Sequence, residues 1–119
     1  MELRFKKKQK TLVIQMEGEL DHHTSVELRR QIGSAWTEMG GRNLVFDFLG
    51  VTFMDSSGIG VMIGRYKETT ALGGRIAIAN PNEKIREIIR LSGLSRLLPV
   101  FDTVAEAIAY AEGREGDAV

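Results

Sequence analysis

The chain has 119 residues, and its apolar and charged fractions, 43% and 27%, are ordinary for a folded soluble protein. That length suits one domain and is too short for two. The formal net charge is zero at pH 7, so no overall field attracts nucleic acid or an anionic membrane, and we expect neither as a partner. The absence of cysteine excludes disulfides, thiolate nucleophiles and cysteine-based metal sites.

No targeting signal is apparent. No apolar run reaches the roughly 18 residues needed to span a bilayer, and the N-terminal stretch lacks the apolar segment of a secretory signal. We therefore expect a cytoplasmic protein consisting of a single domain over residues 1–119. The lysines at 6–10 are interpreted as solvated surface, and the charged segment 112–119 is predicted to be a disordered tail.

Strand patterns recur along the chain. Residues 11–17 alternate apolar and polar side chains, while 44–48 and 76–79 are short apolar runs typical of strands buried on both faces. A weak strand is predicted at 3–5, and an edge strand, where proline costs little, at 99–101.

Four helices are predicted between and after these strands. The first has a capping box at Thr24–Glu27 and ends at Gly40-Gly41, and the second follows the segment 50–55 and ends at Gly73-Gly74. Asn80-Pro81 opens the third, and a second capping box at Thr103–Glu106 opens the fourth. The alternation predicts an α/β domain with a mostly parallel central sheet of about four to five strands and about four helices.

Two loops of the predicted fold follow the carboxyl ends of strands, where functional sites of parallel α/β sheets form. Residues 18–24 carry Asp21-His22-His23, and residues 51–58 carry Ser56. If the loops leave neighbouring strands, the aspartate and the two histidines form a polar rim beside the serine.

The segment Asp55-Ser56-Ser57-Gly58 admits two compatible interpretations. The first is a helix N-cap, because aspartate and serine accept the free N–H groups of a first turn. The second is a phosphoryl acceptor, because a serine at a helix start is exposed and the helix end favours an anion. A phosphate there would be tolerated by its own domain, so it would act on a partner's surface.

Other motifs near this segment favour structural roles. The spacing of Gly58, Gly60 and Gly64 does not match a dinucleotide-binding loop. Because glycine lowers helix stability, we expect a reason for all three, and interpret it as close helix packing or access for a partner. Adjacent histidines cannot easily bind one metal ion, so no metal site is expected. A Ser56 hydrolase triad lacks the strained elbow that such enzymes use. Arg65 is either a partner contact or part of a solvated helix face.

At both loops the sequence resembles the anti-sigma factor antagonists of the STAS domain class. The resemblance lies in Gly18–Thr24, in Phe53–Lys67 and in Leu91–Leu94, and it extends over nearly the whole chain. The Asp-Ser-Ser-Gly motif is typical of phosphorylatable members. The Asp-His-His-Thr and Gly-Arg-Tyr-Lys segments favour the sporulation branch, which controls a forespore sigma factor, over the general-stress branch.

The resemblance implies a non-enzymatic partner-switching cycle without a cofactor of its own. The unphosphorylated protein binds an ATP-bound anti-sigma factor, frees the sigma factor, and is switched off when that anti-sigma factor, a serine kinase, phosphorylates Ser56. A PP2C-type phosphatase restores it. The resemblance implies a partner surface made of Asp21, His22, His23, Thr24, Asp55, Ser56, Ser57, Gly58, Gly60 and Arg65. The alternative is a STAS scaffold that binds constitutively.

Overall fold

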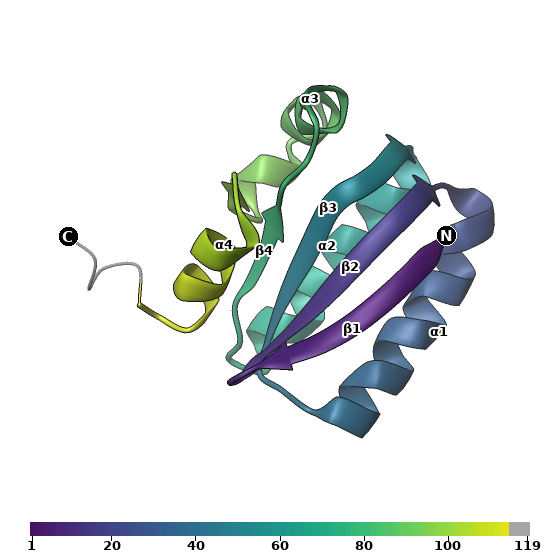
Figure 1. The fold of residues 1–119 in the computed structure, drawn as a ribbon. Coiled ribbons are helices and arrows are strands. Elements are labelled where there is room, and N and C mark those ends of the chain that lie inside the picture. The colour runs from purple at the N-terminus through teal and green to yellow at the C-terminus, as the bar shows by residue number, and fades with distance from the viewer. Residues whose placement is uncertain (115–119) are drawn as a thin grey trace.

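Five strands form one sheet in the computed structural model, which describes residues 1–114 (Figure 1). The strands are β1 Glu2–Lys8, β2 Thr11–Leu20, β3 Asn43–Met54, β4 Ile76–Ala79 and β5 Val100–Phe101. The helices are α1 His22–Met39, α2 Ser56–Ala71, α3 Glu83–Leu91 and α4 Val104–Ala111, with a short 3-10 turn, η1, at Leu94–Arg96. The strands lie in chain order, and among them only β1 is antiparallel to its neighbour. The predicted α/β fold with a mostly parallel sheet is confirmed.

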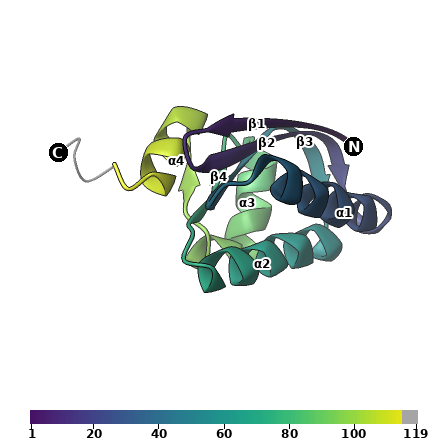
Figure 2. The same ribbon diagram turned by 90° about the horizontal axis from the view of Figure 1, so that it is seen from below.

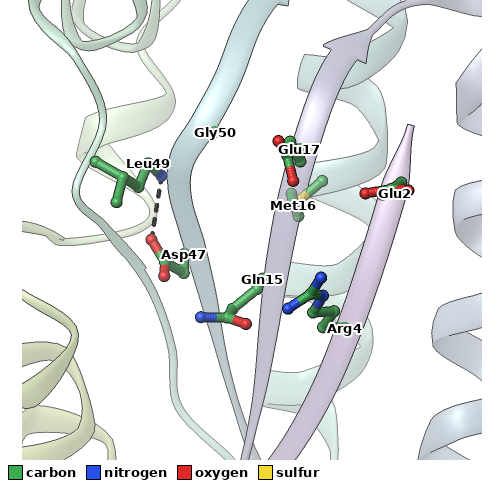
Figure 3. A pocket seen from close by; sticks show the side chains of 8 residues that line it. All are labelled: Glu2, Arg4, Gln15, Met16, Glu17, Asp47, Leu49 and Gly50. Carbon is green, nitrogen blue, oxygen red and sulfur yellow. Dashed lines mark hydrogen bonds between the residues drawn. The ribbon is translucent and has the colours of Figure 1, made fainter.

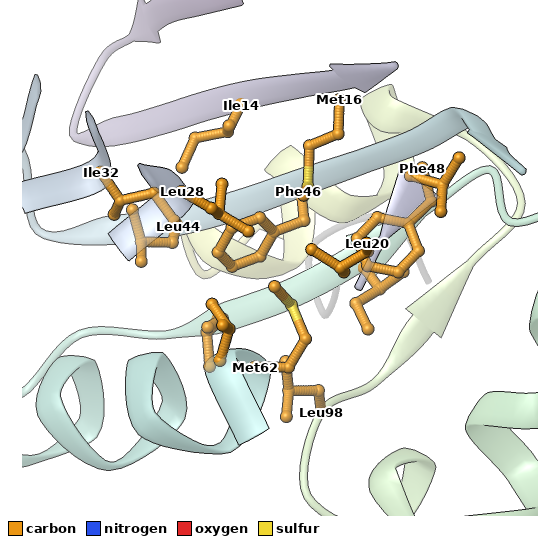
Figure 4. Packing of buried hydrophobic residues seen from close by; sticks show 14 of the residues in the cluster. Ile14, Met16, Leu20, Leu28, Ile32, Leu44, Phe46, Phe48, Met62 and Leu98 are labelled. Atoms are coloured by element: carbon orange, nitrogen blue, oxygen red, sulfur yellow. The ribbon is translucent and has the colours of Figure 1, made fainter. Parts of the chain in front are cut away.

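The helices cover the two faces of the sheet unequally. α1, α2 and α3 lie on one face, and α4 lies on the other, against β3 and β4 (Figure 2). The larger core lies under the three helices, where Phe46 and Phe48 of β3 meet Leu28 of α1 and Met62 of α2 (Figure 4). A smaller cluster of valine and alanine side chains lies under α4. Because helices cover both faces of the sheet, its inner strands carry aliphatic side chains on both sides.

Three strands are longer than the sequence pattern predicts. β2 runs to Leu20, through residues predicted to begin a loop. β1 extends over seven residues although five of its side chains are charged, because an edge strand exposes one side to water. β3 continues beyond Phe48 to Met54, through a segment predicted to be a loop. Its pattern is broken by two register shifts against β2, and each shift adds one residue to β3. The buried Asp47 carboxylate accepts from Leu49 N–H at the first of these irregularities, at 3.1 Å.

The helix starts also differ from the prediction. α1 begins at His22 with Asp21 as its cap, three residues before the predicted cap at Thr24, and its capping box joins Asp21 to Thr24 rather than Thr24 to Glu27. α3 begins at Glu83 with Asn82 as its cap, so Pro81 lies before the helix. Several polar side chains in succession can cap, and local pattern alone did not choose among them.

Cationic side chains meet the C-terminal ends of three helices. Lys7 Nζ donates to the Met39 carbonyl at the end of α1, Arg42 Nε to Gly73 just beyond α2, and Arg75 Nη1 to Tyr110 in α4. Free carbonyls and the negative end of the helix dipole both favour a cation there. Lys7 therefore has a structural partner, which the sequence interpretation of a solvated lysine cluster did not include.

The last described residues are anchored to the sheet. Glu112 Oε2 accepts from Lys10 N at 3.0 Å and from the buried Thr11 hydroxyl. The chain is therefore ordered through the start of the segment 112–119, and residues 115–119 lie outside the described part. Within residues 1–114, no helix is both long and apolar enough to cross a bilayer.

We expect Glu112→Ala to lower the free energy of unfolding by about 1–3 kcal/mol, because it removes a charged acceptor from a backbone amide and a buried hydroxyl. Glu38→Ala is the control, since Glu38 is exposed on α1. Urea denaturation of both variants measures the difference. Equal stability of the two variants would show that Glu112 does not anchor α4.

Candidate functional site

The carboxyl ends of β2 and β3 lie side by side. Leu20 and Met54, the last residues of the two strands, are register partners, and the Asp55 amide donates to the Leu20 carbonyl at 3.3 Å. Because neighbouring strands are about 4.8 Å apart, Asp21 and Asp55 follow at adjacent positions. The two loops predicted to form one site therefore meet at one edge of the sheet.

Asp21 caps α1 with a reciprocal pair of hydrogen bonds. Its Oδ1 accepts from Thr24 N at 3.0 Å, and the Thr24 hydroxyl accepts from Asp21 N at 2.9 Å. The Thr24 amide lowers the pKa of the Asp21 carboxyl, with smaller contributions from the Thr24 hydroxyl and from His23. A carboxyl whose pKa is lowered by folding stabilises the fold at neutral pH and loses that contribution in acid.

The two histidines occupy the first turn of α1 and are both exposed. Their rings meet edge to face, with centroids 6.3 Å apart. His23 also lines a small hollow with Met1 and Leu3, on the side of α1 that faces β1. His23 therefore lies toward the edge strand β1, whereas the predicted polar rim places it beside Ser56. Within residues 1–114 no three histidine, aspartate or glutamate side chains are grouped to hold a metal ion.

Asp55, and not Ser56, caps α2. Its Oδ1 accepts from Ser57 N at 2.8 Å and from Gly58 N at 3.3 Å. Ser56 is the first residue of the helix, is exposed, and takes no part in the cap, whereas Ser57 is half-buried. The N-cap interpretation of the motif thus applies to Asp55, which leaves the Ser56 hydroxyl available to a partner at the positive end of a 16-residue helix.

The three glycines of α2 have different surroundings. A Cβ at Gly58 would lie 2.7 Å from both the carbonyl oxygen and Cγ of Leu20, so only glycine lets α2 sit this close to the end of β2. A Cβ at Gly64 would meet nothing within 4 Å, and one at Gly60 only an Arg29 guanidinium nitrogen at 4.0 Å. The packing interpretation is confirmed for Gly58 and wrong for Gly60 and Gly64.

Sequence reasoning missed two neighbours of the site. Arg29 of α1 lies against Gly60, one turn beyond Ser56, which helical spacing within α2 alone could not reveal. Phe53 precedes the end of β3 and is 38% exposed, an unusual position for phenylalanine. Arg65 lies farther off, nine residues after Ser56, or about 14 Å at 1.5 Å per residue. The structure therefore brings the two loops together without Arg65.

A larger hollow lies elsewhere, on the face of the sheet that α4 leaves open beside β1 and β2 (Figure 3). Its volume is about 410 Å³, and its lining includes Arg4, Gln15 and Glu17 together with Asp47. The Asp47 carboxylate is held by Leu49 N–H. A polar exposed face is usual for strands with one covered side, and the hollow contains neither serine of the motif.

Comparison with known proteins matches residues 2–107 to the STAS domain family. The chain is 36% identical to the anti-sigma F factor antagonist of Paenibacillus polymyxa over 101 residues, and this match covers 85% of this chain and 86% of the relative. It is 38% identical over 84 residues to that of Lysinibacillus sphaericus, over 71% and 72% of the two chains.

The solved structures agree with this result. The unphosphorylated anti-sigma factor antagonist SpoIIAA superposes with a TM-score of 0.78 at 33% identity, over 94% of this chain and 97% of that one. The phosphorylated form of this Bacillus cell fate determinant superposes with a TM-score of 0.69, over 92% and 98%. The chain belongs to the STAS domain family, and its similarity to relatives of the sporulation branch confirms the predicted resemblance.

We expect Gly58→Ala to destabilise the domain by about 1–3 kcal/mol, because the new methyl group overlaps the Leu20 backbone. Gly60→Ala should instead raise stability by up to about 1 kcal/mol, because it has space and alanine favours a helix. Thermal unfolding of both variants checks the pair. A loss of stability at Gly60 equal to that at Gly58 would mean that both positions are packed.

Proposed function

We propose that the protein is an anti-sigma factor antagonist whose binding is switched off by phosphorylation of Ser56. The observation that carries the proposal is the division of roles at the start of α2: Asp55 caps the helix, and Ser56 is exposed beside it without a structural task. Relatives that match most of the chain are named anti-sigma F factor antagonists, and the similar anti-sigma factor antagonist SpoIIAA has been solved in phosphorylated and unphosphorylated forms.

The physical basis of the switch is a contrast between two surfaces. On its own domain, a phosphate on Ser56 would lie at the positive end of α2, one turn before Gly60, which the Arg29 guanidinium approaches. On a partner that covers the site, the same phosphate adds nearly two negative charges to an edge already bearing Asp21 and Asp55. A complete switch needs roughly 5 kcal/mol of differential affinity, and burying an unpaired dianion can supply it.

The partners follow from this cycle. The unphosphorylated protein binds an ATP-bound anti-sigma factor that is a serine kinase, which supplies ATP and Mg²⁺, and a PP2C-type phosphatase removes the phosphate. The protein itself acts as a binding module in the cytoplasm and catalyses nothing. Gly60 and Gly64 support a partner that approaches α2 closely, because each leaves bare backbone where the domain has room for a side chain.

We expect Ser56→Asp to weaken binding to the anti-sigma factor at least tenfold, or about 1.4 kcal/mol, while the melting temperature stays unchanged or rises slightly, because an anion is favourable at a helix start. Calorimetric titration and thermal unfolding measure the two effects. Ser95→Asp, which adds the same charge at an exposed serine of η1 outside the predicted partner surface, is the control for added charge. Wild-type affinity in Ser56→Asp would favour a STAS scaffold that binds constitutively.

Asp21 has two roles that substitutions can separate. Asp21→Asn keeps an equally good N-cap and removes the charge, whereas Asp21→Ala removes both. If the carboxylate contacts the partner, Asp21→Asn weakens binding several-fold without changing stability, and Asp21→Ala also destabilises the domain because it removes the cap. Binding and urea titrations distinguish the two, and unchanged affinity in Asp21→Asn would remove its charge from the interface.

A further inference from the structure

A groove between α1 and α2 contains a buried donor without a partner. The groove has a volume of about 220 Å³ and lies between the C-terminal halves of the two helices. Arg65 reaches into it from α2, and its side chain is only 20% exposed. The predicted alternative of a solvated helix face is therefore wrong for Arg65.

The Arg65 guanidinium is only partly paired. One terminal nitrogen, Nη2, lies 2.9 Å from Glu68 Oε2, in an ion pair whose acidic side chain is 59% exposed. The Nε–H is fully buried and has no hydrogen-bond partner, and within residues 1–114 it is the one buried side-chain polar atom in that state. A buried donor without an acceptor is costly, so native structures rarely keep one without a reason.

The rest of the lining is mixed, with Thr37, Glu68 and Thr69 beside apolar side chains, and the groove is unfilled. The half-buried Trp36 and the 66% exposed Leu72 line it from opposite helices, and Ile32 and Leu44 form its buried floor. A Cβ at Gly33, also in the lining, would meet nothing within 4 Å. The groove therefore offers room for an apolar side chain directly beside a cation that needs an acceptor.

We propose that this groove binds a carboxylate and an adjacent apolar side chain of the anti-sigma factor, with the carboxylate accepting from Arg65 Nε. The proposal rests on the function proposed above and extends its interface. A guanidinium presents Nε and a terminal nitrogen as a fork that matches a carboxylate. The volume is below the roughly 300–1,000 Å³ of small-molecule sites, which favours side chains of a protein over a cofactor.

The groove is also continuous with the candidate site. Asp21 caps the first of these two helices and Ser56 begins the second, and the Arg29 side chain of α1 approaches α2 at Gly60. A partner that covers Ser56 and continues along the helix pair reaches Trp36 and Arg65. Tryptophan and arginine are the residue types that most often anchor protein interfaces.

Replacing the guanidinium tests the proposal. Arg65→Met keeps most of the aliphatic stem and removes both the charge and the unpaired donor, so we expect an unchanged or higher melting temperature together with at least tenfold weaker binding to the anti-sigma factor. Arg90→Met is the matched control, because Arg90 also forms an ion pair with a glutamate three positions away in the sequence, Glu87 on α3, away from the groove. Equal affinity of the two variants would overturn the proposal.

A second variant blocks the groove and leaves the arginine in place. Gly33→Leu adds a side chain from α1 where the structure has room, and we expect it to fold and to weaken binding at least tenfold. Wild-type affinity in a folded Gly33→Leu variant would show that the partner does not enter the groove. Concentration-dependent dimerisation of the free protein that Gly33→Leu abolishes would assign the groove to a second copy, and would also overturn the proposal.

The same titrations separate this inference from the proposed function. If Ser56→Asp loses affinity while Arg65→Met and Gly33→Leu retain it, the switch holds and only the groove contact fails. If Ser56→Asp binds like the wild type, the switch itself fails, whatever the groove variants do.

Discussion

The hydrogen bond from the Asp55 amide to the Leu20 carbonyl marks the point on which the candidate site depends. It continues the parallel pairing of β2 and β3 to the last residue of each strand, which places the caps of α1 and α2 at adjacent positions. Gly58 then allows α2 to rest on Leu20 without a clash. At the other end of the molecule, Lys7 and Arg42 meet the carbonyl ends of the same helices. Both helices are thus fixed at both ends, and the site lies on a rigid support.

This rigidity explains how a surface can change its binding without changing its fold. Capping by Asp55 leaves Ser56 free of structural duty, so added charge there costs the domain little. Gly60 and Gly64, in contrast, lower the stability of the fold. Glycine reduces helix stability by roughly 1 kcal/mol at each position, and no contact within the domain requires it. In the proposed function, these two glycines give a partner close access to the backbone of α2.

Much of this arrangement could be predicted from the sequence. Alternating strands and helices predict the mostly parallel sheet. Two polar loops that follow strand ends are predicted to meet, as the adjacent positions of Asp21 and Asp55 confirm. The continuation of β3 through Gly50 was missed, because glycine in a strand resembles a turn residue. The fold needs glycine there, since a Cβ would lie 2.9 Å from the Met16 carbonyl. The burial of Arg65 was missed as well, because it depends on how α1 packs across α2. Non-local packing of this kind has no local signature.

The central claim is that one hydroxyl, that of Ser56, carries the switch. The most direct measurement is to incubate the full chain with its anti-sigma factor and ATP, locate any phosphate by peptide mass spectrometry, and follow the complex by size-exclusion chromatography. The account predicts a single phosphate on Ser56, accompanied by dissociation of the complex. Phosphate on Ser57, or a complex that survives phosphorylation of Ser56, would contradict it.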